Sequence, residues 1–156
     1  MTTLHVSAID PARLSTIRRN NHDESGNSLV PFRSEGWEPL RCCLALAAEE
    51  ESILLISYTP FTVGSPWAET GPVFVHRDQC YGYGATEHLP EKLRTGPRVL
   101  KTYRADGSLD YADITVVTEG QDIEATLLDL LGRPAVATVH VRALAAQCFT
   151  YAVTGR

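Results

Sequence analysis

The sequence predicts an α+β fold: a mostly antiparallel, curved β-sheet of about seven strands with two or three short helices. Apolar runs of strand length recur along the chain, 53–59 being the longest. Proline and glycine separate these runs, and only two segments carry helical start and stop signals. The chain has 156 residues, enough for a sizeable hydrophobic core, so we expect a single domain over residues 1–156.

Local patterns place the individual elements. A helix is predicted from Pro11 to about Arg19, because Asp10 is a favourable N-cap and proline is favoured at the first helical position. A second helix is predicted over 122–131, followed by Gly132. Strand-like segments are residues 4–9, 40–46, 53–59, 73–76, 98–103, 112–118, 135–142 and 147–154.

A long polar stretch, at about residues 20–39, lies between the first helix and the next apolar segment. It contains Pro31, Gly36 and Pro39 and few apolar side chains, so we expect it to bury little. A loop of this length is typically either a functional flap or poorly ordered.

Composition narrows the classes of partner. The formal net charge is −5, and no basic patch is evident, so a nucleic-acid partner is not expected. No apolar run is long enough to span a membrane, and the first residues do not resemble a secretory signal. We therefore expect a cytoplasmic protein whose four cysteines are free thiols, with no membrane partner.

The last two strand segments are predicted to form a hairpin whose register follows from their alternation. Apolar residues lie opposite apolar residues only if the residue numbers of each facing pair add up to an even number. A five-residue loop then places Arg142 opposite Cys148 and His140 opposite Thr150. The predicted result is one face that carries His140, Arg142 and Cys148.

Two histidines within strand-like runs, His76 and His140, are the strongest indication of chemistry. Histidine carries protons near neutral pH, and arginine holds carboxylate or phosphate. Our leading hypothesis is a small-molecule enzyme without an organic cofactor, in which His76, His140 and Arg142 act on an anionic substrate. Expected substrate-binding residues are Arg41, Tyr58, Glu69, Cys80 and Cys148.

Two alternatives remain open. One is a non-catalytic module that binds a metabolite or a protein partner, and an exposed sheet edge would also permit a homodimer. The other is zinc binding through the pairs His76/Cys80 and His140/Cys148, although their spacing is not that of a zinc ribbon or finger. Cys42 and Cys43 are expected on opposite faces of a strand, where they cannot both bind one metal ion.

Several motifs resemble a known family in their order along the chain. They include Gly71-Pro72-Val73-Phe74-Val75-His76 followed by Cys80, and Val139-His140-Val141-Arg142 followed by Cys148-Phe149. Together with Asp23-Glu24, Leu40-Arg41-Cys42-Cys43-Leu44 and Ser57-Tyr58, they are similar to the bacterial family catalogued as domain of unknown function 1203. The resemblance covers nearly the whole chain. It implies a small stand-alone cytoplasmic protein and no particular reaction.

Overall fold

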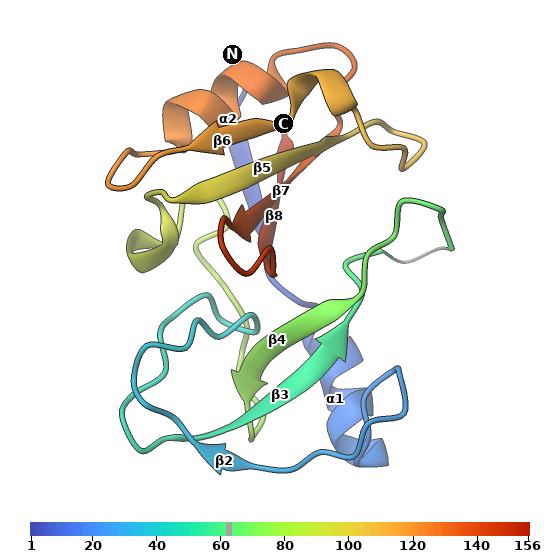
Figure 1. Cartoon of the computed structure of the whole chain (residues 1–156), viewed down its shortest axis with the longest axis vertical. Helices are drawn as coiled ribbons and strands as arrows, with labels where there is room; N and C mark the ends of the chain where they lie inside the picture. Colours follow the sequence, from blue (N-terminus) through green and yellow to red (C-terminus); the bar gives the residue numbers. More distant parts are fainter. Residues whose placement is uncertain (62–63) are drawn as a thin grey trace.

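A computed structural model describes residues 1–61 and 64–156 and has an α+β architecture (Figure 1). Its described part contains eight strands in two antiparallel sheets and two α-helices. None of the described helices has the length and hydropathy needed to cross a membrane. The helices are α1 (Pro11–Asn20) and α2 (Glu124–Leu131), with 3₁₀ turns at Glu91–Leu93 and Tyr111–Asp113; the strands are β1 (Leu4–Ser7), β2 (Phe32–Arg33), β3 (Ser52–Tyr58), β4 (Gly71–His76), β5 (Arg98–Tyr103), β6 (Thr115–Val117), β7 (Thr138–Ala143) and β8 (Phe149–Gly155).

The larger sheet has the strand order β1-β8-β7-β5-β6 and lies in the upper half of Figure 1. Helix α2 packs on it, because Leu127 and Leu130 of the helix join Val139 and Tyr151 of the central strands in one hydrophobic cluster. The hydroxyl of Tyr151 donates a hydrogen bond to the carbonyl of Leu93, 3.1 Å away, so this buried polar group is satisfied.

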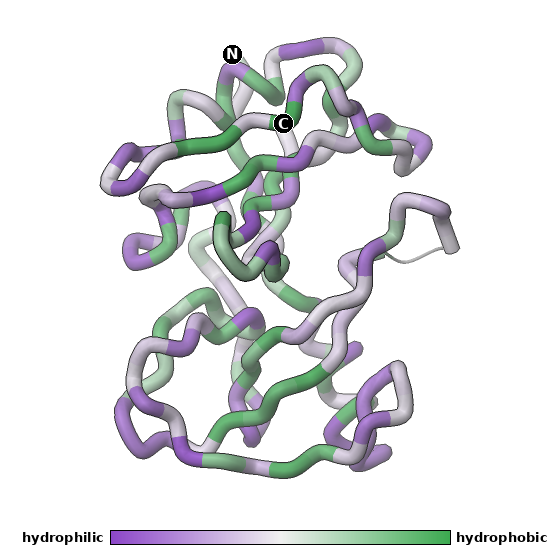
Figure 2. Tube along the Cα trace, in the orientation of Figure 1, coloured by the Kyte–Doolittle hydropathy of each residue, from purple (hydrophilic) through white to green (hydrophobic). Residues whose placement is uncertain are grey.

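The smaller sheet, β2-β3-β4, occupies the lower half of the molecule and has its own core. Leu14 and Ile17 of α1 pack with Ile56 of β3 and Val73 of β4. Hydrophobic segments run along the strands of both halves in Figure 2, as expected for two sheets that each bury one face.

Strand β8 and the segment before β3 connect the two halves. Phe149, at the start of β8, packs in the core of the smaller sheet. Its carbonyl accepts a hydrogen bond from Nε of Arg41 at 2.8 Å. The backbone N–H of Ile9 donates to the carbonyl of the same arginine at 3.1 Å. Arg41 is therefore fixed between the two sheets.

Most predicted elements are confirmed, with three corrections. The strand over 98–103 and the first helix are found where the patterns placed them. The strands form two sheets instead of one curved sheet, and there are eight of them in the described chain. Residues 40–46 form a turn instead of a strand, and 112–118 begins with a 3₁₀ turn before β6.

In the C-terminal hairpin, the residue numbers of the facing pairs from Thr138 to Val141 add up to an even number, as predicted, but the partners differ from the predicted ones. His140 lies opposite Ala152 instead of Thr150, a shift of two residues that leaves each side chain on its predicted face. A bulge between Val141 and Arg142 then places Arg142 opposite Phe149 instead of Cys148. The predicted pairing assumed a regular ladder, and the bulge breaks that assumption.

Two buried carboxylates organise the polar stretch 20–39, against the expectation that it buries little. Asp23 accepts a hydrogen bond from the backbone N–H of Ser57 in β3 at 2.8 Å, and two more from backbone groups of its own turn. Glu38 accepts hydrogen bonds from three successive backbone N–H groups that end at Trp37. These carboxylates are only 1% and 2% exposed, so the stretch is an ordered part of the fold.

Candidate metal centre

The turn that replaces the predicted strand at 40–46 brings two cysteines together. Leu44 adopts a left-handed conformation, with φ at 61°, and its N–H donates to the carbonyl of Leu40 at 2.8 Å. A parallel bridge from Leu40 to Phe74 attaches the turn to β4. In a strand, Cys42 and Cys43 would point to opposite faces, but in this turn their sulfur atoms lie on the same side of the chain.

Four possible metal ligands converge at this turn. The Sγ atoms of Cys42, Cys43 and Cys80 and a ring nitrogen of His76 all lie within 4.8 Å of one another. Sulfur ligands about 2.3 Å from a tetrahedral zinc ion are roughly 3.8 Å apart. The widest separation in this set therefore exceeds the spacing of zinc-bound sulfur atoms by only about 1 Å.

The His76 ring has an orientation that suits a metal ligand. Its Nε2 atom is 3.4 Å from Sγ of Cys43, and its Nδ1 atom is 2.5 Å from a carboxylate oxygen of Glu51. Histidine ligands of metal ions almost always donate their other ring N–H to a carboxylate, a carbonyl or water, which fixes the tautomer. Glu51 immediately precedes β3, which pairs with β4 so that Ile53 lies opposite His76.

The two adjacent cysteines, Cys42 and Cys43, shift the pKa of each other's thiol in opposite directions. A hydrogen bond from the Cys42 thiol, together with the nearby His76, holds the pKa of Cys43 below its ordinary value. The same hydrogen bond and the burial of Cys42 raise the pKa of Cys42. The backbone N–H of His76 donates to Sγ of Cys42 at 3.3 Å. The arrangement therefore favours a thiolate at Cys43, the form in which cysteine binds metals.

The other predicted histidine, His140, lies in a separate place. Its ring is packed against the rings of Tyr103, Phe61 and Phe149, at centroid distances of 4.5, 5.3 and 5.1 Å. Burial, reinforced by the positive charges of Arg142 and Lys101, lowers the pKa of His140 to about 3. His140 lines one pocket together with Phe61 and Tyr103, and His76 lines a different pocket together with Glu51 and Cys80.

Four other predicted residues do share one cavity. Tyr58, Glu69, Arg142 and Cys148 line a cavity of about 250 Å³ between the two sheets. Arg41 contacts its wall through the carbonyl of Phe149. The predicted group of site residues is therefore divided: His76 and Cys80 belong to the metal-ligand cluster, Arg142 lines the cavity between the sheets, and Arg41 lies behind the wall formed by Phe149.

Sequence reasoning missed two members of the cluster, Cys42 and Cys43, and the carboxylate of Glu51 that contacts His76. The two cysteines were excluded as joint ligands because the segment was interpreted as a strand. Their adjacency, combined with the spacing of His76 and Cys80, was the available signal. Glu51 lies within the run Glu49-Glu50-Glu51, which local pattern does not distinguish from an ordinary acidic turn.

Comparison with known proteins gives one match. Searches of curated proteins and of solved structures found nothing similar to the chain. The model of a family described as "Protein of unknown function (DUF1203)" matches residues 37–155, a range that contains all four residues of the metal-ligand cluster. The match covers more than half of the chain and agrees with the resemblance noted in the sequence motifs, so the chain belongs to the DUF1203 family.

Proposed function

We propose that this protein binds one zinc ion through Cys42, Cys43, Cys80 and His76. The observation that carries the proposal is the convergence of three sulfur atoms and one imidazole nitrogen within 4.8 Å. Three cysteines and one histidine form one of the usual ligand sets of structural zinc. The contact between Glu51 and Nδ1 of His76 supplies the outer carboxylate that such sites commonly have.

The composition of the cluster favours a structural ion over a catalytic one. Catalytic zinc sites usually have three protein ligands and leave one position for water or substrate, whereas this cluster offers four. The ligands come from the turn at 41–44, from the last residue of β4 and from the segment that follows β4. A bound ion would cross-link these segments and stabilise the half of the molecule built on the smaller sheet.

The geometry favours this zinc hypothesis over acid–base catalysis by the two predicted histidines. A shared role requires both rings at one substrate, and they line separate pockets. With a pKa of about 3, His140 is neutral near physiological pH and cannot exchange a proton efficiently there. His76 is engaged by Glu51 and faces sulfur.

The proposal is tested by metal analysis of protein purified without an affinity tag under reducing conditions. We expect one zinc per chain by inductively coupled plasma mass spectrometry, measured as isolated and after addition of zinc followed by desalting. Cys43→Ser and Cys80→Ser should each lose most of the bound zinc. Cys148→Ser is the matched control, because Cys148 is the one cysteine outside the cluster, and it should retain the ion.

Several results of the metal analysis would contradict the zinc proposal. A folded protein that retains no zinc after reconstitution overturns the proposal, as does zinc that survives both cluster substitutions. Stoichiometric iron or copper in place of zinc would also overturn the choice of metal. Replacement of zinc by cobalt gives a second measurement, since thiolate-to-cobalt charge-transfer absorption should appear in the wild type and weaken in Cys43→Ser.

A further inference from the structure

The cavity between the two sheets is lined by one buried cation, Arg142, and by one partly exposed carboxylate, Glu69. Arg41 and Arg142 are only 4% and 5% exposed. Among the described residues, Glu69 is the only carboxylate that pairs with Arg142 or Lys101, and Arg41 has no carboxylate partner. The donors of Arg41 are bonded to the carbonyls of Phe149 and Pro39, which carry no charge. Arg142 and Lys101 therefore share one carboxylate, and Arg41, which does not line the cavity, has neutral partners only.

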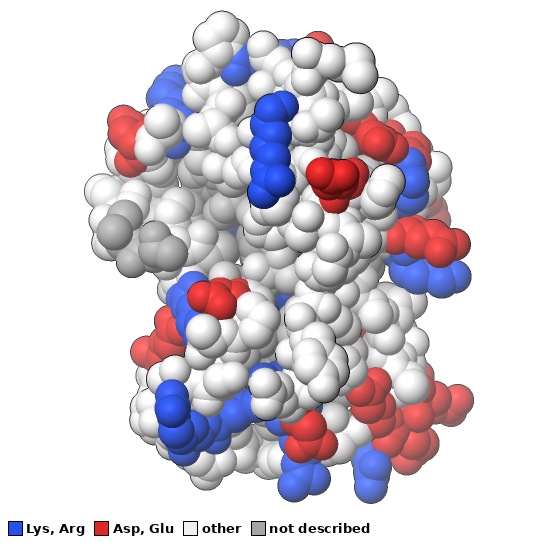
Figure 3. All heavy atoms as spheres, turned by 180° about the vertical axis from the view of Figure 1, so that it is seen from behind, with Lys and Arg blue, Asp and Glu red and all other residues white. Residues whose placement is uncertain are grey.

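This charge imbalance points to an anion. Charges withdrawn from water are costly unless they are paired and hydrogen-bonded. Consistent with that cost, burial lowers the pKa of Arg41 to about 10. The face of the molecule drawn in Figure 3 carries side chains of both signs, and in its upper half several of them lie next to a side chain of the opposite sign.

Two N–H donor groups of the Arg142 side chain have no hydrogen-bond acceptor in the described structure. Its Nη1 atom donates to the carbonyl of Gln147 at 3.0 Å. Its Nε and Nη2 atoms are buried and have no hydrogen-bond acceptor within the described structure. Nη2 lies 3.2 Å from a carboxylate oxygen of Glu69, which is an ion pair without the alignment of a hydrogen bond. Nε and Nη2 together form the parallel fork that holds a carboxylate through two hydrogen bonds.

We propose that this cavity binds a small organic carboxylate, which displaces Glu69 from Arg142. The Glu69 side chain is 46% exposed and also contacts Lys101 at 2.9 and 3.0 Å, so it retains a partner when it leaves Arg142. The cavity is also lined by the rings of Tyr58 and Phe149, which suit a short aliphatic group. Its volume of about 250 Å³ is small for a ligand pocket and therefore suits a small ligand. This inference is independent of the metal proposal.

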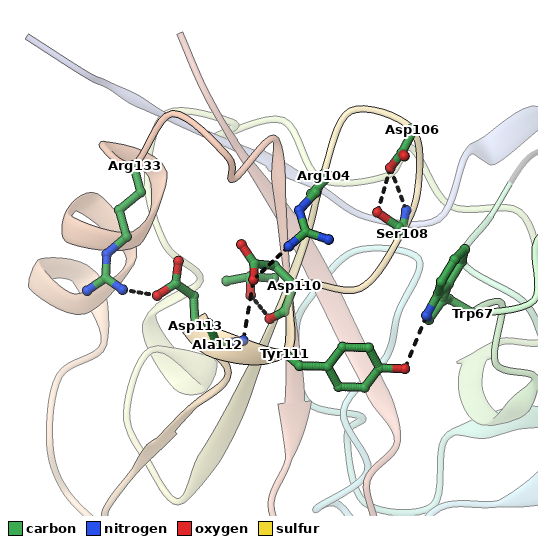
Figure 4. A network of polar contacts seen from close by, with 10 residues as sticks. Trp67, Arg104, Asp106, Ser108, Asp110, Tyr111, Ala112, Asp113 and Arg133 are labelled. Carbon is green, nitrogen blue, oxygen red and sulfur yellow. Dashed lines mark hydrogen bonds and ion pairs between the residues drawn. The ribbon is translucent and has the colours of Figure 1, made fainter.

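Trp67 provides a reporter close to the displaced group. Its indole N–H donates to the hydroxyl of Tyr111 at 3.1 Å, as Figure 4 shows, and it precedes Glu69 by two residues. The chain has two tryptophans, so a Trp37→Phe background leaves Trp67 as the sole tryptophan fluorophore. We would titrate this protein, as isolated, with sodium propionate and use sodium chloride at equal ionic strength as the reference.

Glu69→Gln is the decisive variant, because it removes the internal competitor. Propionate should bind this variant about two- to fivefold more tightly than the parent, the effect expected for loss of one partly exposed ion pair. Adding Arg142→Lys should abolish that gain, since lysine keeps the charge but lacks the fork. Arg19→Gln on the exposed face of α1 is the control and should bind like the parent.

Unchanged or weaker propionate binding in Glu69→Gln overturns the proposal. A response that chloride reproduces, or one that persists in the Glu69→Gln/Arg142→Lys protein, also overturns it. The Glu69→Gln result stands alone if substitution of the buried arginine prevents folding, because the side chain at position 69 is partly exposed and its loss removes no core packing.

Discussion

Replacing His140 by phenylalanine should remove a specific acid sensitivity of the fold. The imidazole is 4% exposed, three aromatic rings surround it, and its Nδ1 atom has no hydrogen-bond partner. Burial, and then the charges of Arg142 and Lys101, lowers its pKa to about 3. A phenyl ring has a similar shape and no polar atoms, so His140→Phe should be at least as stable as the wild type at about pH 8.

The sign and size of the acid effect follow from linkage. The ordinary pKa of histidine, about 6.5, applies to the unfolded chain. Below that value the unfolded chain binds a proton that the folded protein excludes, so stability is lost as pH falls from about 6.5 toward 3. The full difference corresponds to about 5 kcal/mol, of which about 2 kcal/mol is lost by pH 5.

Urea unfolding at about pH 8 and pH 5 measures this effect. The free energy of unfolding of the wild type should fall by about 2 kcal/mol more than that of His140→Phe between the two conditions. Other titrating groups contribute to both proteins and cancel in the difference. His88→Gln is the control at an exposed histidine and should behave like the wild type. Equal losses in His140→Phe and the wild type would refute the assignment of a neutral, buried imidazole.

Three further predictions concern stability. Asp23→Ala should lower the free energy of unfolding by about 2–4 kcal/mol in urea titrations, because it leaves the buried N–H of Ser57 without its acceptor. Glu38→Ala should cost a similar amount and selectively speed amide exchange at Trp37, whose N–H it releases; unchanged exchange there would contradict the assigned role. Removing zinc with a chelator should lower the melting temperature, and restoring free zinc to a hundredfold excess over its Kd should return about 3 kcal/mol; a melting temperature unaffected by the chelator would contradict a structural ion.

Local sequence patterns were sufficient to predict a helix or strand where its own residues determine the structure that it adopts. The apolar run 53–59 and the alternating segment 98–103 form strands because both bury apolar side chains, whichever strands they pair with. The first helix begins where predicted because the Asp10 side chain accepts a hydrogen bond from the N–H of Ala12. Such signals need no information from distant parts of the chain.

Local patterns failed at 40–46 because the apolar residues at alternate positions are buried there without a strand, and Arg41 between them is buried as well. Leu40, Cys42 and Leu44 are all nearly inaccessible, as the strand hypothesis requires. The chain nevertheless turns at Leu44, and the bridge that fixes it runs to Phe74, more than thirty residues away. Alternation reports which side chains are buried, and it does not report whether the backbone between them is extended.

In the candidate site, too, residues close together in the sequence were predicted, and residues brought in by the fold were not. The spacing of His76 and Cys80 is local, and both residues do enter the cluster. Their partners could not be chosen from spacing, because Cys42 and Cys43 reach them only through the misassigned turn. The hairpin pattern instead suggested His140 and Cys148, which the fold places elsewhere. A ligand set assembled from separate segments is a property of the tertiary structure.

The turn at 40–44 supports both proposed sites. Its cysteines supply two of the four metal ligands, and Arg41, immediately before them, donates to the carbonyl of Phe149 at the wall of the cavity. The positions of adjacent residues in a tight turn cannot vary independently, because they share backbone dihedrals fixed by the left-handed Leu44. If the proposed ion binds these cysteines, it would therefore also restrict the movement of Arg41 between the two sheets.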